Sequence, residues 1–121
     1  MNKTLLFAAL CAAGISTTNA QAPTIEDRLT DLELRTSRFV SGKEKMVGGF
    51  AQLPADLRQV ACQAYPTRSD SEAIAGFKDQ IAFLESPDSA SKLDPGQAAR
   101  LATQKETVSA LVPGVDCSKL P

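Results

Sequence analysis

The sequence predicts an all-α protein: a small bundle of about four short helices with one disulfide, preceded by a cleaved signal peptide. Three observations support this prediction. Apolar residues recur at intervals of three and four, which is the period of a helix face. Residues that favour helix starts precede these runs, and proline or glycine follows them. No run alternates apolar and polar side chains with β-branched residues, as a half-buried strand would.

Residues 1–20 have the layout of a secretory signal peptide, in which Lys3 supplies the charge before an apolar run over residues 5–15. That run is too short to cross a bilayer. Small residues near Ala20 place the expected cleavage directly after it. A lipid anchor would need a small residue just before a cysteine at the end of the apolar run, and Cys11 does not meet this requirement.

Cleavage leaves residues 21–121, which we interpret as a single small helical domain of 101 residues. Without Lys3 it carries 12 basic and 14 acidic side chains, a net charge of −2. Such a balance gives no electrostatic reason to expect nucleic acid as a partner, and no segment of the mature chain is expected to insert stably into a membrane. The expected location is the periplasm, with secretion as the alternative.

The mature chain keeps two cysteines, Cys62 and Cys117, because Cys11 leaves with the signal. In an exported protein, two cysteines most simply form one disulfide. A loop of this length would stabilise the fold by about 4 kcal/mol in the chain-entropy treatment. Two free thiols are the alternative. No C-x-x-C motif is present, so catalytic thiol exchange is not expected.

The first expected helix starts at Thr24, which can cap it, with Asp27 three positions further on. It is expected to end at Met46 or Val47, because Gly48-Gly49 follows. Residues 21–47 are thus treated as an N-terminal helix that can project from the helical body formed by residues 54–112.

The second expected helix begins at Pro54, a favourable first-turn residue, and ends before Pro66. Cys62 lies about 140° around the helix from Leu57, at ~100° per residue. The disulfide is therefore expected to leave from a different face than the apolar stripe, which consists of Leu57, Val60, Ala61 and Ala64.

The third and fourth expected helices carry clear start signals. Ser69 and Glu72 can form a capping box for the third, and Asp94 followed by Pro95 can start the fourth. A helical turn is expected after Pro87 in the connector, and residues 113–121 form a tail tethered by the disulfide. The expected apolar positions are Ile74, Phe77, Ile81 and Leu84 in the third helix, and Ala98, Leu101, Val108 and Val112 in the fourth.

The residue inventory argues against an enzyme. Histidine is absent, which removes Ser-His-Asp and Cys-His systems and histidine metal sites. The string S89-A-S-K92 matches the S-x-x-K nucleophile motif, but the S-D-N and K-T-G strings that must accompany it do not occur. We therefore expect no catalytic residues, no metal site and no cofactor.

The first expected helix also fits a heptad repeat. Its seam positions begin at Ile25 and are alternately four and three residues apart. In a parallel pair, Arg28 of one chain would reach Glu33 of the other. Core packing, self-association and docking of another protein are the three open interpretations, and the broader stripe after Phe39 favours the core for that half. The partner-binding candidates are Ile25, Arg28, Leu29, Leu32, Glu33 and Arg35.

These observations predict an exported, non-enzymatic helical protein that acts through protein–protein interaction, such as an envelope or secretion-system accessory. One alternative is a structural subunit that self-assembles through the N-terminal heptad helix. Another is a small periplasmic chaperone or inhibitor. A protein partner is expected in each of these three cases, and a homo-oligomer is expected for the self-assembling subunit.

Overall fold

The computed structural model describes residues 23–120, and the described chain is all-helical with no strands. The expected signal peptide lies outside the described residues. All four expected helices are present, together with the one-turn helix after Pro87. The elements are α2 (Ile25–Ala51), α3 (Ala55–Gln63), α4 (Arg68–Glu85), α5 (Pro87–Ala90), α6 (Pro95–Ser109) and the 3₁₀ helix η1 (Cys117–Lys119).

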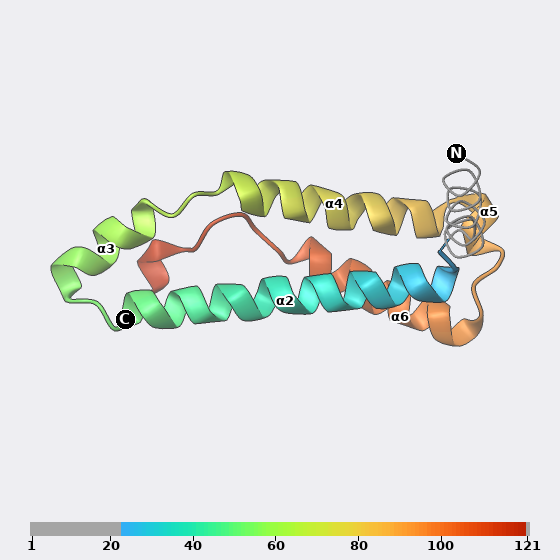
Figure 1. The fold of residues 1–121 in the computed structure, drawn as a ribbon, viewed down its shortest axis with the longest axis horizontal. Helices are drawn as coiled ribbons and strands as arrows, with labels where there is room; N and C mark the ends of the chain where they lie inside the picture. The colour runs from blue at the N-terminus through green and yellow to red at the C-terminus, as the bar shows by residue number, and fades with distance from the viewer. Residues whose placement is uncertain (1–22, 121) are drawn as a thin grey trace, which may run out of the picture.

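Three of these helices form the bundle, because α2, α4 and α6 pack against one another in every combination. Figure 1 shows α2 and α6 running in the same direction, with α4 antiparallel to both. α3 lies at one end, where it contacts α2 and η1. The expected bundle of about four helices is thus a three-helix bundle with a fourth helix at its end.

Each bundle helix contributes to one apolar core. Leu29 and Leu32 of α2 are 0% and 1% exposed, and they belong to one buried cluster with three apolar residues of α4 and two of α6. The prediction of the buried face of α4 is confirmed at all four positions, whereas two positions predicted to be apolar contacts of the fourth helix, Ala98 and Val112, are exposed. The buried core cluster comprises Leu29, Leu32, Phe77, Ile81, Leu84, Leu101 and Val108.

The predicted end of the first helix at Gly48-Gly49 is wrong, because α2 continues through both glycines to Ala51. A glycine in a helix interior costs only about 1 kcal/mol relative to alanine. The additional turn brings the Phe50 ring edge-on to Tyr65, with ring centroids 6.4 Å apart. The Thr24 capping box is confirmed: its hydroxyl accepts from the Asp27 amide at 3.0 Å.

The start of α4 also differs from the prediction. Ser69 does not cap it, since the helix begins two residues earlier than predicted, with Thr67 at the cap position, and no side chain caps that end. Glu72 instead pairs with Arg68 one turn before it, at 3.2 Å. The capping pattern did not indicate a role for Asp70. In the structure, its carboxylate points inward and is buried.

The fourth helix starts as predicted and ends early. Asp94 accepts from the Gln97 amide at 2.7 Å, which confirms the cap. α6 stops at Ser109, so Val112 lies in the tail and is exposed. Gly114 in this tail has φ +80°, a conformation that favours glycine. A Cβ there would lie 3.0 Å from Thr67.

Replacing Leu32 by alanine is expected to lower the free energy of unfolding by about 2–5 kcal/mol, because it leaves a cavity in the core. The matched control is Leu34→Ala, two residues away on the same helix and 52% exposed. The control is expected to change the free energy of unfolding by at most about 0.5 kcal/mol. Denaturant unfolding followed by circular dichroism measures both, and equal losses would contradict the core assignment.

Candidate functional site

The structure corrects the heptad interpretation for two of the six partner-binding candidates. Leu29 and Leu32 are fully buried between α4 and α6, so their side chains are not available to another chain in this fold. Ile25 is partly buried and packs against the same core. The N-terminal helix that was expected to be able to project therefore packs into the core through Leu29 and Leu32. The reason is that a seam spaced four and three suits a three-helix core as well as a coiled coil.

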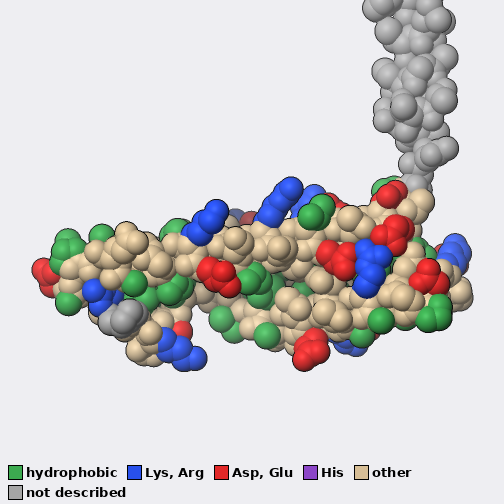
Figure 2. Space-filling model, turned by 90° about the horizontal axis from the view of Figure 1, so that it is seen from below, with side chains coloured by type: hydrophobic (Ala, Val, Ile, Leu, Met, Phe, Trp, Pro, Cys, Tyr) green, Lys and Arg blue, Asp and Glu red, His purple; other side chains and the backbone are tan. Residues whose placement is uncertain are grey.

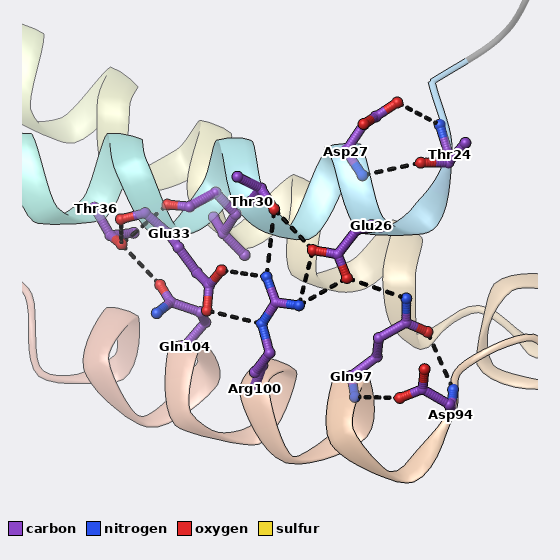
Figure 3. Close-up of polar contacts among 11 residues, drawn as sticks. Thr24, Glu26, Asp27, Thr30, Glu33, Thr36, Asp94, Gln97, Arg100 and Gln104 are labelled. Carbon is purple, nitrogen blue, oxygen red and sulfur yellow. Dashed lines mark hydrogen bonds and ion pairs between the residues drawn. The ribbon is translucent and has the colours of Figure 1, made fainter.

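Glu33 forms an ion pair within its own chain. Arg100 of α6 lies between two carboxylates of α2, as Figure 3 shows: its Nη2 donates to Glu33 Oε1 at 2.5 Å, and its Nη1 donates to both Glu26 oxygens at 2.7 and 2.9 Å. One turn further along, the buried Thr36 hydroxyl lies 2.7 Å from Gln104 Oε1. These contacts fasten α2 to α6, and they span 67 to 74 residues, a separation that no local pattern reveals.

Arg100 lowers the pKa of the neighbouring Glu26 carboxyl. Its hydrogen bonds, followed by those from Thr30 and Gln97, lower the pKa of Glu26 to about 2. The pKa of Arg100 rises above its ordinary value, chiefly through the hydrogen bonds with Glu33 and then Glu26. Both shifts favour the charged forms of Glu26 and Arg100 at neutral pH, so the contacts of Arg100 with Glu26 and Glu33 form an ionic clasp between α6 and α2.

Arg28 and Arg35 remain accessible beside a groove between α2 and α4. The Arg28 guanidinium lies over the Phe83 ring, 4.1 Å from its centroid, and Arg35 pairs with Asp31 at 2.8 Å on the solvent side. The groove has a volume of about 700 Å³, and we call it the α2–α4 groove. It is lined by Asp31, Leu32, Arg35, Arg38 and Phe39 of α2, and by Glu72, Ala73, Gly76, Phe77 and Gln80 of α4.

A buried polar clamp fastens the C-terminal tail. Lys43 pairs with Asp70 at 2.5 Å, and it also donates to the Gly114 carbonyl. Asp70 accepts from the Gly114 amide at 2.8 Å and from the Tyr65 hydroxyl at 3.0 Å. Burial alone would raise the pKa of Asp70, but the hydrogen bonds from these three groups hold it below its ordinary value. Burial, followed by the hydrogen bond to this carboxylate, raises the pKa of Tyr65.

The face of α3 that carries Cys62 is covalently attached to the C-terminal tail. The predicted Cys62–Cys117 disulfide is confirmed, with the two Cα atoms 5.8 Å apart. Cys62 is 3% exposed, and Gln59 on the same helix donates to the Cys117 carbonyl at 2.8 Å. The predicted angular separation from the apolar stripe is consistent with this arrangement, but the stripe points outward. Leu57 is 53% exposed and Val60 is 64% exposed.

The sequence pattern had identified the stripe without indicating its direction. An amphipathic helix normally turns its apolar face to the core. Here the disulfide fixes the opposite face, and within the described residues α3 packs mainly against α2 and η1. Figure 2 shows hydrophobic side chains at the end of the molecule where α3 lies.

Other kinds of site have little support in the described part of the chain. Within residues 23–120, no three acidic or cysteine side chains gather as ligands for a metal ion would. Over the same residues, no helix combines the length and the apolar character that crossing a bilayer requires. Comparisons with protein-family models, curated proteins and solved structures found no match to this chain.

Acidification tests the ionic clasp. Because the folded-state pKa of Glu26 is about 2 and its ordinary value is 4.5, its contribution to stability is complete above about pH 4.5 and is lost as the pH falls toward 2. Glu26→Gln is therefore expected to be less stable than the natural chain at pH 6, with the difference narrowing by pH 2. Urea unfolding at several pH values measures this.

The control for this prediction is Glu106→Gln, an exposed acid on α6 for which the structure shows no ion pair in the described chain. Its difference from the natural chain is expected to stay small at every pH. A Glu26→Gln difference that stays constant between pH 6 and pH 2 would contradict the clasp.

Proposed function

We propose that this chain is an exported, non-enzymatic helical protein that acts by binding another protein, such as an accessory of the cell envelope or of a secretion system. The observation that supports this most is the outward apolar stripe of α3. Leu57 and Val60 are both more than half exposed on a helix whose opposite face is covalently fastened. We propose this stripe as the docking surface.

The arrangement of the stripe favours a helix as the partner element. Single exposed apolar residues are ordinary on protein surfaces. Leu57, Val60 and Ala64, however, follow one another at spacings of three and four, which is the seam spacing of paired helices. An amphipathic partner helix can lay its own apolar face along such a seam.

The disulfide prepares α3 for binding. A helix of 9 residues is too short to be stable alone in water. The Cys62–Cys117 bond and the Gln59 hydrogen bond to the tail hold it in place before any partner arrives. Docking to a pre-ordered helix avoids part of the entropy that ordering would otherwise cost.

The proposed location is the periplasm, with secretion as the alternative. A disulfide is kept in oxidising compartments, and residues 1–20 have the pattern of a signal peptide. A small periplasmic chaperone or inhibitor would be a particular form of the same proposal. Self-assembly through the N-terminal heptad has less support, because that seam needs the buried Leu29 and Leu32.

Export is tested by the mass of the protein isolated from its native cells. The expected species begins at Gln21 and is two hydrogen masses lighter than its reduced form, because signal removal and disulfide formation occur together in an exported chain. Intact-mass spectrometry with and without reductant measures both features. A chain that retains residues 1–20, or one with free thiols, would contradict export.

Docking at α3 is tested by a photo-reactive amino acid at Val60, introduced in native cells. We expect one discrete covalent adduct, and we expect Leu57→Lys to remove it because a charge then interrupts the seam. The same probe at Leu34, an equally apolar and exposed position on α2, is the matched control and should not give this adduct.

Two further results decide the interpretation of this experiment. Leu57→Lys should leave the free energy of unfolding within about 0.5 kcal/mol of the natural chain, since the side chain is exposed. No adduct at Val60, or an adduct that persists in Leu57→Lys, would overturn the proposed docking surface.

A further inference from the structure

α3 carries a polar side chain on its inward side and apolar side chains on its outward side. Leu57 and Val60 are 53% and 64% exposed, whereas Cys62 on the opposite side is 3% exposed. Arg58 lies four residues before Cys62, on the same inward side of the helix. Its Nε atom is buried and has no hydrogen-bond partner among the described residues. An unpartnered buried donor and exposed apolar side chains both cost free energy, so contacts outside the helix must hold this orientation.

The contacts that hold α3 in this orientation converge on one residue of the tail. Cys62 is bonded to Cys117, and Gln59 donates to the Cys117 carbonyl at 2.8 Å. Figure 1 shows α3 beside the short η1 helix that begins at this cysteine. The buried core cluster of the described chain contains no residue of α3. The covalent bond is therefore the main constraint on which side of α3 faces inward.

The rest of the fold is fastened independently of this bond. Two residues after α3, the Tyr65 hydroxyl donates to Asp70 at 3.0 Å. Three residues before Cys117, the Gly114 amide donates to the same carboxylate at 2.8 Å, and its carbonyl accepts from Lys43. These contacts hold the chain on the bundle side of both cysteines. Breaking the disulfide therefore frees α3 and the residues around Cys117, and it leaves the bundle folded.

We propose that the Cys62–Cys117 bond is a redox switch for the docking surface on α3. This inference rests on the proposed function, because it concerns the regulation of the same surface. When the bond is reduced, α3 comes free and repacks, so that Leu57 and Val60 leave water and Arg58 reaches it. The oxidised chain alone then presents the apolar stripe. A short helix with two alternative packings is the kind of element that a thiol–disulfide change can control.

A dithiol is the reductant in this switch. Cys117 is partly exposed and Cys62 is buried, so a thiolate of the dithiol reaches the Cys117 Sγ. Its attack forms a mixed disulfide with Cys117 and breaks the bond to Cys62, which leaves as a thiolate and takes up a proton. The second thiol of the dithiol loses its proton and attacks the dithiol's own sulfur in the mixed disulfide. Cys117 is released and protonated, and the dithiol becomes a disulfide.

The same exchange runs in reverse with a disulfide donor. The donor is reduced to a dithiol, the two cysteines are oxidised, and the bond again fixes α3 with its stripe outward. An oxidising compartment keeps such a bond formed. The switch thus makes the docking surface available where the protein is proposed to act.

Carbene footprinting of residues 21–121, before and after reduction with dithiothreitol, tests the switch without any partner. In the oxidised chain, Leu57 and Val60 should be labelled strongly, because both lie in water. After reduction, their labelling should fall to the level of the core residue Leu32. Leu34, which is 52% exposed on α2, is the matched control and should be labelled equally in both states. Cys62→Ser combined with Cys117→Ser should match the reduced natural chain without reductant.

Two footprinting results would overturn the switch. Labelling of Leu57 and Val60 that is unchanged by reduction would mean that the bond does not set the orientation of α3. Labelling that spreads to Leu32 on reduction would mean that the bond holds the whole fold rather than α3 alone.

The photo-reactive amino acid at Val60 separates this inference from the proposed function. In native cells, its adduct should form on the natural chain and be lost in Cys62→Ser combined with Cys117→Ser, with both chains present in equal amounts. An adduct that persists in this variant would overturn the switch and leave the docking surface in place. A natural chain that gives no adduct, but whose footprint changes on reduction as expected, would support the switch and contradict the docking proposal.

Discussion

The Cys62–Cys117 disulfide determines which face of α3 points inward, and the surface that the protein presents depends on it. The bond joins the buried side of a 9-residue helix to the C-terminal tail. With that side fastened, the apolar side has no place in the core and remains in water. Apolar burial alone would favour the opposite orientation, so the covalent constraint outweighs it at this helix.

The bundle can tolerate this orientation because its core is complete without α3. Leu29 and Leu32 fill the space between α4 and α6, and Arg100 clasps α2 from the α6 side. The tail is held separately, by the buried pair of Lys43 and Asp70. α2 passes through both regions, and its extension through Gly48-Gly49 connects the bundle to the disulfide-bonded end.

Local patterns in the sequence predicted the helices well, and they left the tertiary arrangement open. The caps at Thr24 and Asp94 and the buried face of α4 follow from residues within one or two turns of each other. The partners of Arg100 lie 67 and 74 positions away, and the buried Asp70 contacts Lys43 and Gly114, 27 and 44 positions away, so no periodicity encodes these contacts. The stripe of α3 was visible, but its direction required knowing which neighbours α3 has.

Solvent paramagnetic relaxation of the methyl groups in the oxidised chain tests the orientation of α3 most directly. A soluble paramagnetic probe broadens the signals of methyl groups that lie in water and spares buried ones. The account predicts strong broadening for Leu57 and Val60, and little for Leu29 and Leu32 in the same sample. Equal protection of all four residues would mean that α3 turns its apolar stripe inward, and it would contradict the account.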